Sequence, residues 1–147
     1  MVRYATMNDA VRYLQVIPER AILPSLEGLS PFRAIVLVRE TVSNDWRNRV
    51  SDWLVSSGCL YMLAWGIDCS VWDDAVDWSN LAAFDFKPIP PDRFVMTTWH
   101  EDESMEEVFW FAKHSAEHPT VSLGSNLILD IASTGQETET VATWMNS

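Results

Sequence analysis

A chain of 147 residues is the size of one ordinary domain, and 48% hydrophobic against 21% charged residues is typical of a folded globular protein. No apolar run approaches the roughly 18 residues that a membrane-spanning helix needs, so a membrane is not an expected partner. The formal net charge of −11 repels phosphate backbones and disfavours nucleic acid binding.

The acidic charge is concentrated in the later part of the chain. Residues 1–50 hold seven arginines against five acids, whereas residues 51–147 hold three basic residues against sixteen acids. Such a surface suits a basic protein partner or a metal ion, and the alternative is that the acids only aid solubility. The first fifteen residues lack the apolar core of a secretion signal, and two cysteines are too few for a disulfide framework. We therefore expect a cytoplasmic protein with free thiols.

Residues 1–32 are predicted to form an N-terminal extension outside the main fold. A short helix from Asn8 to Ile17 is expected to end at Pro18, because proline cannot continue a helix. The loop that follows is rich in proline, serine and glycine. This extension would cover a sheet edge or serve an interface.

Four continuous apolar runs predict strands that are buried on both faces of a sheet. They are residues 34–38, 60–65, 94–99 and 127–132. Helix signals lie between them, over about residues 44–57, 70–83 and 104–118. The second and third helices open on a serine followed three residues later by an acid, Asp73 or Glu107, which is the spacing of a capping box.

The alternation of strand and helix predicts a parallel sheet with right-handed crossovers. We expect an α/β fold: a single three-layer domain over residues 33–132, with a mainly parallel four-stranded sheet of the flavodoxin-like or Rossmann-like kind. The polar residues 133–147 are predicted to be a frayed tail, although Trp144 and Met145 would be unusual residues to leave in water.

Open α/β sheets bind ligands beyond the carboxyl ends of their strands, which nominates the residues after each strand. Five of these residues carry donors, mostly carboxylates, for Mg²⁺ or Mn²⁺ in a phosphohydrolase-like centre: Glu40, Asp68, His100, Asp102 and Glu103. The alternative is that they cap helices and solvate loops. No glycine-rich loop for a nucleotide follows the first strand, and no cofactor other than this ion is expected.

A hydrolase built on cysteine and histidine is a second enzymatic hypothesis. Cys69 would be the nucleophile, since a helix N-terminus lowers the pKa of a thiol, and His100 would be the base, with Asp68 beside them. Position alone supports this hypothesis. Packing and surface roles are the alternative for both residues.

Binding of another protein is the preferred hypothesis. On the third predicted helix, Trp110 lies outside the apolar stripe, beside Glu106, as an interface anchor would. Cover by a neighbouring loop is the alternative. Acidic charge with an aromatic anchor favours a basic partner, as in inhibitor, immunity-type or accessory proteins. A second copy of the chain, giving a homodimer, is also open.

The stretch "WGIDCSVWDDAVDW" at residues 65–78 contains three more candidates for partner binding, Asp73, Asp74 and Asp77. On a helical wheel they fall within about a 100° arc opposite Val71 and Trp78, which predicts a solvated helix face.

Two unusual stretches resemble a family of small bacterial proteins defined as a domain of unknown function. They are "GCLYMLAWGIDCSVWDDAVD" and "FVMTTWHEDESMEEVFWFAKHSAEHPTV". The resemblance covers about residues 32–132 and leaves the first 30 residues and the tail unmatched. It implies a bacterial cytoplasmic setting and transfers no catalytic residue to this chain.

Overall fold

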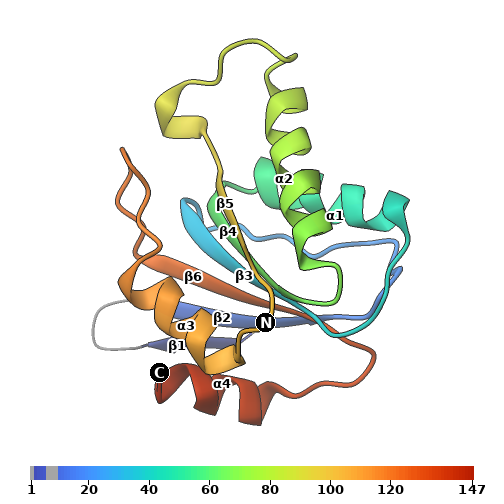
Figure 1. Cartoon of the computed structure of the whole chain (residues 1–147), viewed down its shortest axis with the longest axis vertical. Coiled ribbons are helices and arrows are strands. Elements are labelled where there is room, and N and C mark those ends of the chain that lie inside the picture. The colour runs from blue at the N-terminus through green and yellow to red at the C-terminus, as the bar shows by residue number, and fades with distance from the viewer. Residues whose placement is uncertain (1, 6–9) are drawn as a thin grey trace.

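The protein has one six-stranded sheet with helices on both faces (Figure 1); the computed structural model describes residues 2–5 and 10–147. The strands, in the order β1-β2-β6-β3-β4-β5, are β1 (Val2–Ala5), β2 (Ala10–Val16), β3 (Phe32–Val38), β4 (Cys59–Gly66), β5 (Met96–His100) and β6 (Ser125–Ile131). The helices are α1 (Asn44–Ser56), α2 (Cys69–Ala83), the short 3₁₀ helix η1 (Pro91–Arg93), α3 (Met105–His114) and α4 (Glu137–Met145). None of the helices in the described part of the chain is long and apolar enough to span a bilayer.

The predicted α/β domain with a parallel sheet is confirmed, with five parallel strands instead of four. Strand β1 runs antiparallel to β2, and every other pair of neighbouring strands is parallel. Successive residues of the buried strands point to opposite faces. Along β3, Val36 packs on the side of α1 and α2, whereas Ile35 and Leu37 pack on the side of α3 and α4. Continuous apolar runs therefore produce three layers.

The predicted N-terminal helix is wrong for residues 10–16, which form the parallel strand β2 beside β6. Residues 8 and 9, the start of that prediction, lie outside the described residues. Val11 and Tyr13 are both buried in the core, with the two-residue period of a strand. The side of β6 that faces away from β3 supplies the backbone hydrogen-bond partners of β2, which a local pattern does not reveal. The segment is therefore part of the sheet.

The predicted frayed tail is also wrong, because residues 137–145 form helix α4. Trp144 is fully buried, and its ring meets that of Phe109 on α3 edge to face at 5.3 Å between centroids. Burial of this one large side chain docks an otherwise polar segment.

Candidate functional site

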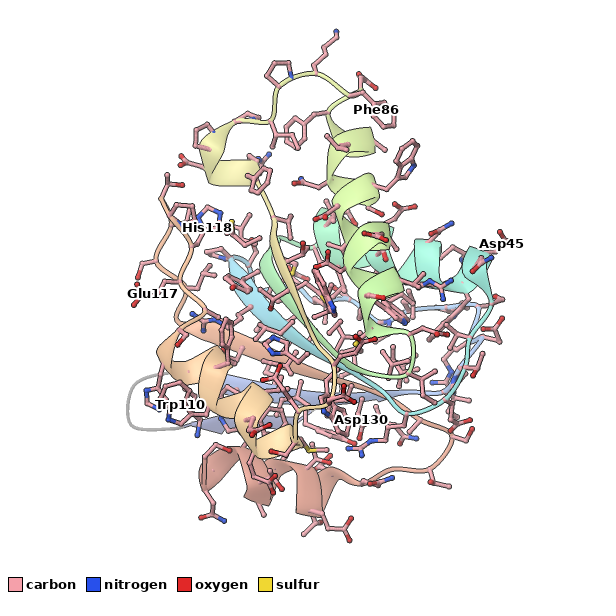
Figure 2. The ribbon with its side chains drawn as sticks, in the orientation of Figure 1. Asp45, Phe86, Trp110, Glu117, His118 and Asp130 are labelled. Atoms are coloured by element: carbon pink, nitrogen blue, oxygen red, sulfur yellow. The ribbon has the colours of Figure 1, made fainter. Side chains whose placement is uncertain are left out.

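A buried ion pair joins the carboxyl ends of β3 and β6. The Arg39 Nε donates to Asp130 Oδ1 at 2.6 Å, and the Tyr13 hydroxyl donates to the other oxygen of the same carboxylate. Asp130, labelled in Figure 2, is fully buried. Burial of Tyr13, together with the hydrogen bond to Asp130 and the Asp130 charge, raises the pKa of the Tyr13 hydroxyl. Arg39 also donates to Thr140 of α4 at 3.1 Å. This network holds β2, β3, β6 and α4 together and leaves no free carboxylate oxygen on Asp130 within the described chain.

Glu40, a predicted metal ligand, ties the β3 and β6 loops together. Its carboxylate accepts from the Ser133 hydroxyl at 2.7 Å and from the Ser133 backbone N–H. These two hydrogen bonds lower the pKa of Glu40, because they stabilise the ionised form. The side chain therefore has a structural partner at the end of β6.

His100, at the end of β5, is held through both ring nitrogens. Nδ1 lies 2.9 Å from the Glu103 carboxylate, Nε2 lies 2.9 Å from the Thr98 hydroxyl, and the side chain is buried. The predicted ligands His100 and Glu103 are thus in contact, whereas Asp68 and Asp102 are on exposed turns with positive φ. A histidine with both nitrogens occupied is poorly placed to bind a metal or to serve as a base without rearrangement.

Cys69 is the first residue of α2, and its thiol lies against the backbone of His100, so the structure brings these two predicted residues together. The cysteine is only 2% exposed, and burial raises its pKa. Cys59, which is also buried, has its pKa raised by burial to about 12. Both thiols are therefore protonated at neutral pH, and the thiolate is the form that attacks a substrate.

The two thiols are expected to resist modification in the native protein. At neutral pH, a disulfide reagent such as DTNB should react fully with Cys59 and Cys69 only after denaturant is added, because burial and protonation both slow the reaction. Absorbance of the released thiolate with time measures this. Fast native-state labelling of Cys69 alone would contradict it and would favour the cysteine hydrolase.

Helix α2 presents a different face to the sheet from the one predicted. Trp72 and Val76 are buried, and Trp78 is 64% exposed. Asp73 is 7% exposed and lies toward β5, so the predicted solvated position is wrong for this residue. The predicted capping box at Ser70 is absent as well, because the helix begins at Cys69 after Asp68, whose side chain makes no cap bond.

An open groove of about 550 Å³ lies beside the N-terminal part of α3. It is lined by Glu103, Glu106, Glu107, Trp110, Phe111, Asn146 and Ser147. We call it the acidic–aromatic groove. Trp110, labelled on α3 in Figure 2, is 53% exposed. Three of the seven lining residues are glutamates, and no lysine or arginine is among these described residues.

The walls of this groove are fixed by hydrogen bonds at the start of α3. Ser104 and Glu107 form the predicted capping box, with the Glu107 carboxylate accepting from the Ser104 N–H at 2.8 Å. The Glu103 carboxylate is hydrogen-bonded to His100. The backbone carbonyl oxygen of Glu103 accepts a hydrogen bond from the Trp65 indole N–H at 2.8 Å. The sequence did not single out Glu107 and Phe111 as lining residues. Glu107 lies four residues after Glu103 and three before Trp110, and Phe111 lies four residues after Glu107. This helical spacing was the available signal.

A family model described as "Domain of unknown function (DUF7684)" matches residues 11–147. The match includes β2 and α4, which the sequence resemblance left outside. No curated protein and no solved structure matches the chain. Because the model covers nearly the whole chain, the protein belongs to this family of domains of unknown function.

Proposed function

We propose that this domain is a protein-binding module that holds a basic segment of a partner in the acidic–aromatic groove. The observation that carries the proposal is the half-exposed Trp110 beside three glutamates in an open groove. A large aromatic side chain left in water is costly, and such residues are enriched among the anchors of protein interfaces.

The chemistry of the groove suits an arginine side chain best. A guanidinium stacks on a tryptophan face and donates paired hydrogen bonds to a carboxylate. Trp110 supplies the ring and Glu106 an exposed carboxylate on the preceding turn of α3. Glu103 and Glu107 are already held by hydrogen bonds, so they lose little side-chain entropy when a ligand binds.

The charge of the whole chain supports the same class of partner. A net charge of −11 attracts basic surfaces over about a Debye length and speeds their association. An acidic surface with an aromatic anchor complements a cationic site on a partner, which fits an inhibitor, immunity-type or accessory role. The hydrolase alternatives receive less support, because His100 is held through both nitrogens and the pKa of Cys69 is raised.

Trp110→Ala is expected to weaken binding of a short arginine-containing peptide by about 2 kcal/mol, or roughly thirtyfold in Kd. The reason is the loss of the stacking surface. Fluorescence anisotropy of a labelled peptide at about 0.15 M ionic strength measures the affinity and limits nonspecific attraction. The same peptide with citrulline in place of arginine should bind weakly to the wild type, since it lacks the charge.

Trp78→Ala is the matched control, because Trp78 is an exposed tryptophan on α2, outside the groove. It should leave the peptide affinity unchanged. Equal losses in the two variants would indicate nonspecific attraction to an acidic protein and would overturn the proposal. Sedimentation of the unliganded protein tests the other occupant: a dimer that Trp110→Ala dissociates would assign the groove to a second copy of the chain.

A further inference from the structure

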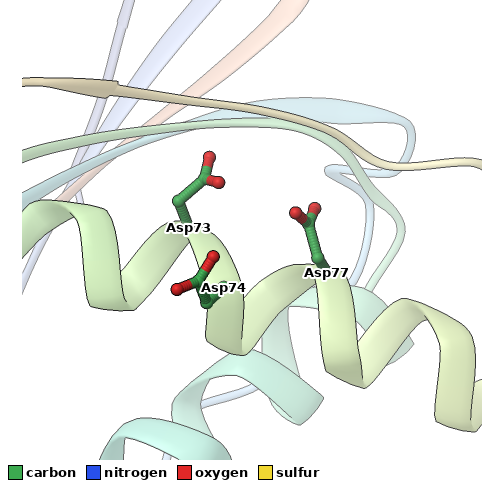
Figure 3. Close-up of side chains that lie close together, drawn as sticks. All are labelled: Asp73, Asp74 and Asp77. Carbon is green, nitrogen blue, oxygen red and sulfur yellow. The ribbon is translucent and has the colours of Figure 1, made fainter.

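Helix α2 carries three aspartates whose carboxylates converge beside the edge strand β5. One oxygen from each of Asp73, Asp74 and Asp77 lies within 4.8 Å of the others. Figure 3 shows Asp73 and Asp77 rising from the helix on the side of β5. Across from them, the Thr97 hydroxyl donates to Asp77 Oδ1 at 2.7 Å. Within the described ranges, these three aspartates are the group whose donor atoms lie close enough together to hold a metal ion. The five ligands predicted at the strand ends do not form such a group.

Asp73 is the unusual member of this cluster. It is only 7% exposed, and its Oδ1 has no hydrogen-bond partner within the described part of the chain. A buried carboxylate oxygen without a partner is costly and rare in folded proteins. Asp130 provides the contrast, because it is fully buried but is paired with Arg39 and Tyr13.

The surroundings of Asp73 do not neutralise its charge. Burial raises its pKa, a hydrogen bond with the Thr97 hydroxyl lowers it, and the negative charges of Asp77 and Asp74 raise it again. Burial also raises the pKa of Asp77. No cationic group contributes to either shift among the described residues. The cluster thus combines converging oxygens, an unpaired buried oxygen and negative charge that lacks a counter-ion.

We propose that Asp73, Asp74 and Asp77 bind a hard divalent cation of the Mg²⁺ and Mn²⁺ class. Such ions take carboxylate, hydroxyl and water oxygens, and Mg²⁺ is usually held by one or two carboxylates with several retained waters. The Asp74 and Asp77 carboxylates lie toward solvent, which leaves room for those waters. An ion there gives the buried Asp73 carboxylate a positively charged partner, and it strengthens the contact between α2 and β5.

The test is a titration of chelator-treated protein with Mn²⁺. Binding is measured as the decrease in the electron paramagnetic resonance signal of free Mn²⁺. We expect one tight site in the wild type that excess Mg²⁺ displaces. Asp73→Asn and Asp77→Asn should each weaken it on the order of tenfold or more, since even the loss of an outer-shell group costs that much. Asp45→Asn, which removes an exposed aspartate on α1, is the matched control and should bind as the wild type does.

Thermal melting separates loss of the ion from loss of the fold. In EDTA, Asp73→Asn should melt no lower than the wild type, because it removes an unpaired buried charge. Millimolar Mg²⁺ should raise the melting temperature of the wild type and not that of Asp73→Asn, because an ion that binds only the folded state stabilises it. Equal Mn²⁺ affinity in the wild type and Asp73→Asn, or equal losses in Asp45→Asn and Asp73→Asn, would overturn the proposal.

Discussion

Trp144→Ala should lower the free energy of unfolding by about 3–5 kcal/mol, the usual cost of truncating a fully buried tryptophan. Trp144 is 0% exposed, packs edge to face on Phe109 and lies under the Lys113 ammonium, whose Nζ is 4.8 Å from a ring centroid. Truncation would leave a cavity between α3, α4 and the sheet. Urea unfolding followed by far-ultraviolet circular dichroism measures the change.

Met145→Ala is the control for this change, because Met145 is the next residue and is 41% exposed. Its loss should cost less than about 1 kcal/mol, as is usual for surface positions. A small effect of Trp144→Ala, comparable to that of Met145→Ala, would contradict the docking of α4 and would restore the interpretation of residues 133–147 as a frayed tail.

Arg39→Ala should destabilise the protein by about 3 kcal/mol, because it leaves the Asp130 carboxylate buried without a cation. Asp130 is fully buried, the Arg39 side chain is 17% exposed, and the two are 2.6 Å apart. The Tyr13 hydroxyl would still donate a hydrogen bond to Asp130, but it is neutral and cannot offset the negative charge of the carboxylate. Urea unfolding again provides the measurement, with Arg49→Ala, an exposed arginine of α1, as the control.

A second substitution distinguishes buried charge from lost packing. Adding Asp130→Asn to Arg39→Ala removes the carboxylate charge while it keeps an oxygen that can accept from Tyr13. The double variant should therefore be more stable than Arg39→Ala alone. If it is less stable, the cost of Arg39→Ala comes from lost contacts with Thr140 and Trp65, and the charge argument is wrong.

Local signals predicted those parts of the fold whose stabilising contacts are close in sequence. The capping box of Ser104 and Glu107 forms as expected, since it spans only four consecutive residues. The continuous apolar runs also predicted the parallel strands β3, β4, β5 and β6. Burial on both faces is wrong for β5, which is an edge strand with Trp99 50% exposed. Each of these predictions needs only a short stretch of sequence.

Two segments whose structure depends on distant partners were predicted wrongly. Residues 10–16 fit both a helix and a strand, and pairing with β6, more than a hundred residues later, decides between them. Helix α2 buries Trp72 and Val76 because α1, β4 and β5 surround that face, which no helical wheel reveals. The helical wheel therefore predicts a solvated Asp73, whereas the residue is buried, and this burial makes it a candidate ligand.

The candidate sites also contain some residues that a local pattern predicts and some contacts that it does not. Trp110 and Glu106 could be selected from the helical period alone, and the structure places both in one groove. The residues after the strands lie at the carboxyl end of the sheet, as the topology implies, but they do not form one cluster. Glu40 is hydrogen-bonded to Ser133 there, and His100 to Glu103. Sequence position identifies the carboxyl end of the sheet but does not reveal these hydrogen bonds between side chains.

Nuclear magnetic resonance titration of the ¹⁵N-labelled protein with an arginine-containing peptide tests the central claim most directly. The eight tryptophans each supply one indole N–H signal, and Trp110→Ala identifies that of Trp110. Binding in the acidic–aromatic groove predicts shifts of the Trp110 indole and of the backbone at the start of α3, with the Trp78 indole unmoved. Shifts spread evenly over the acidic surface, or a Trp110 signal that does not move at saturation, would contradict the proposed function.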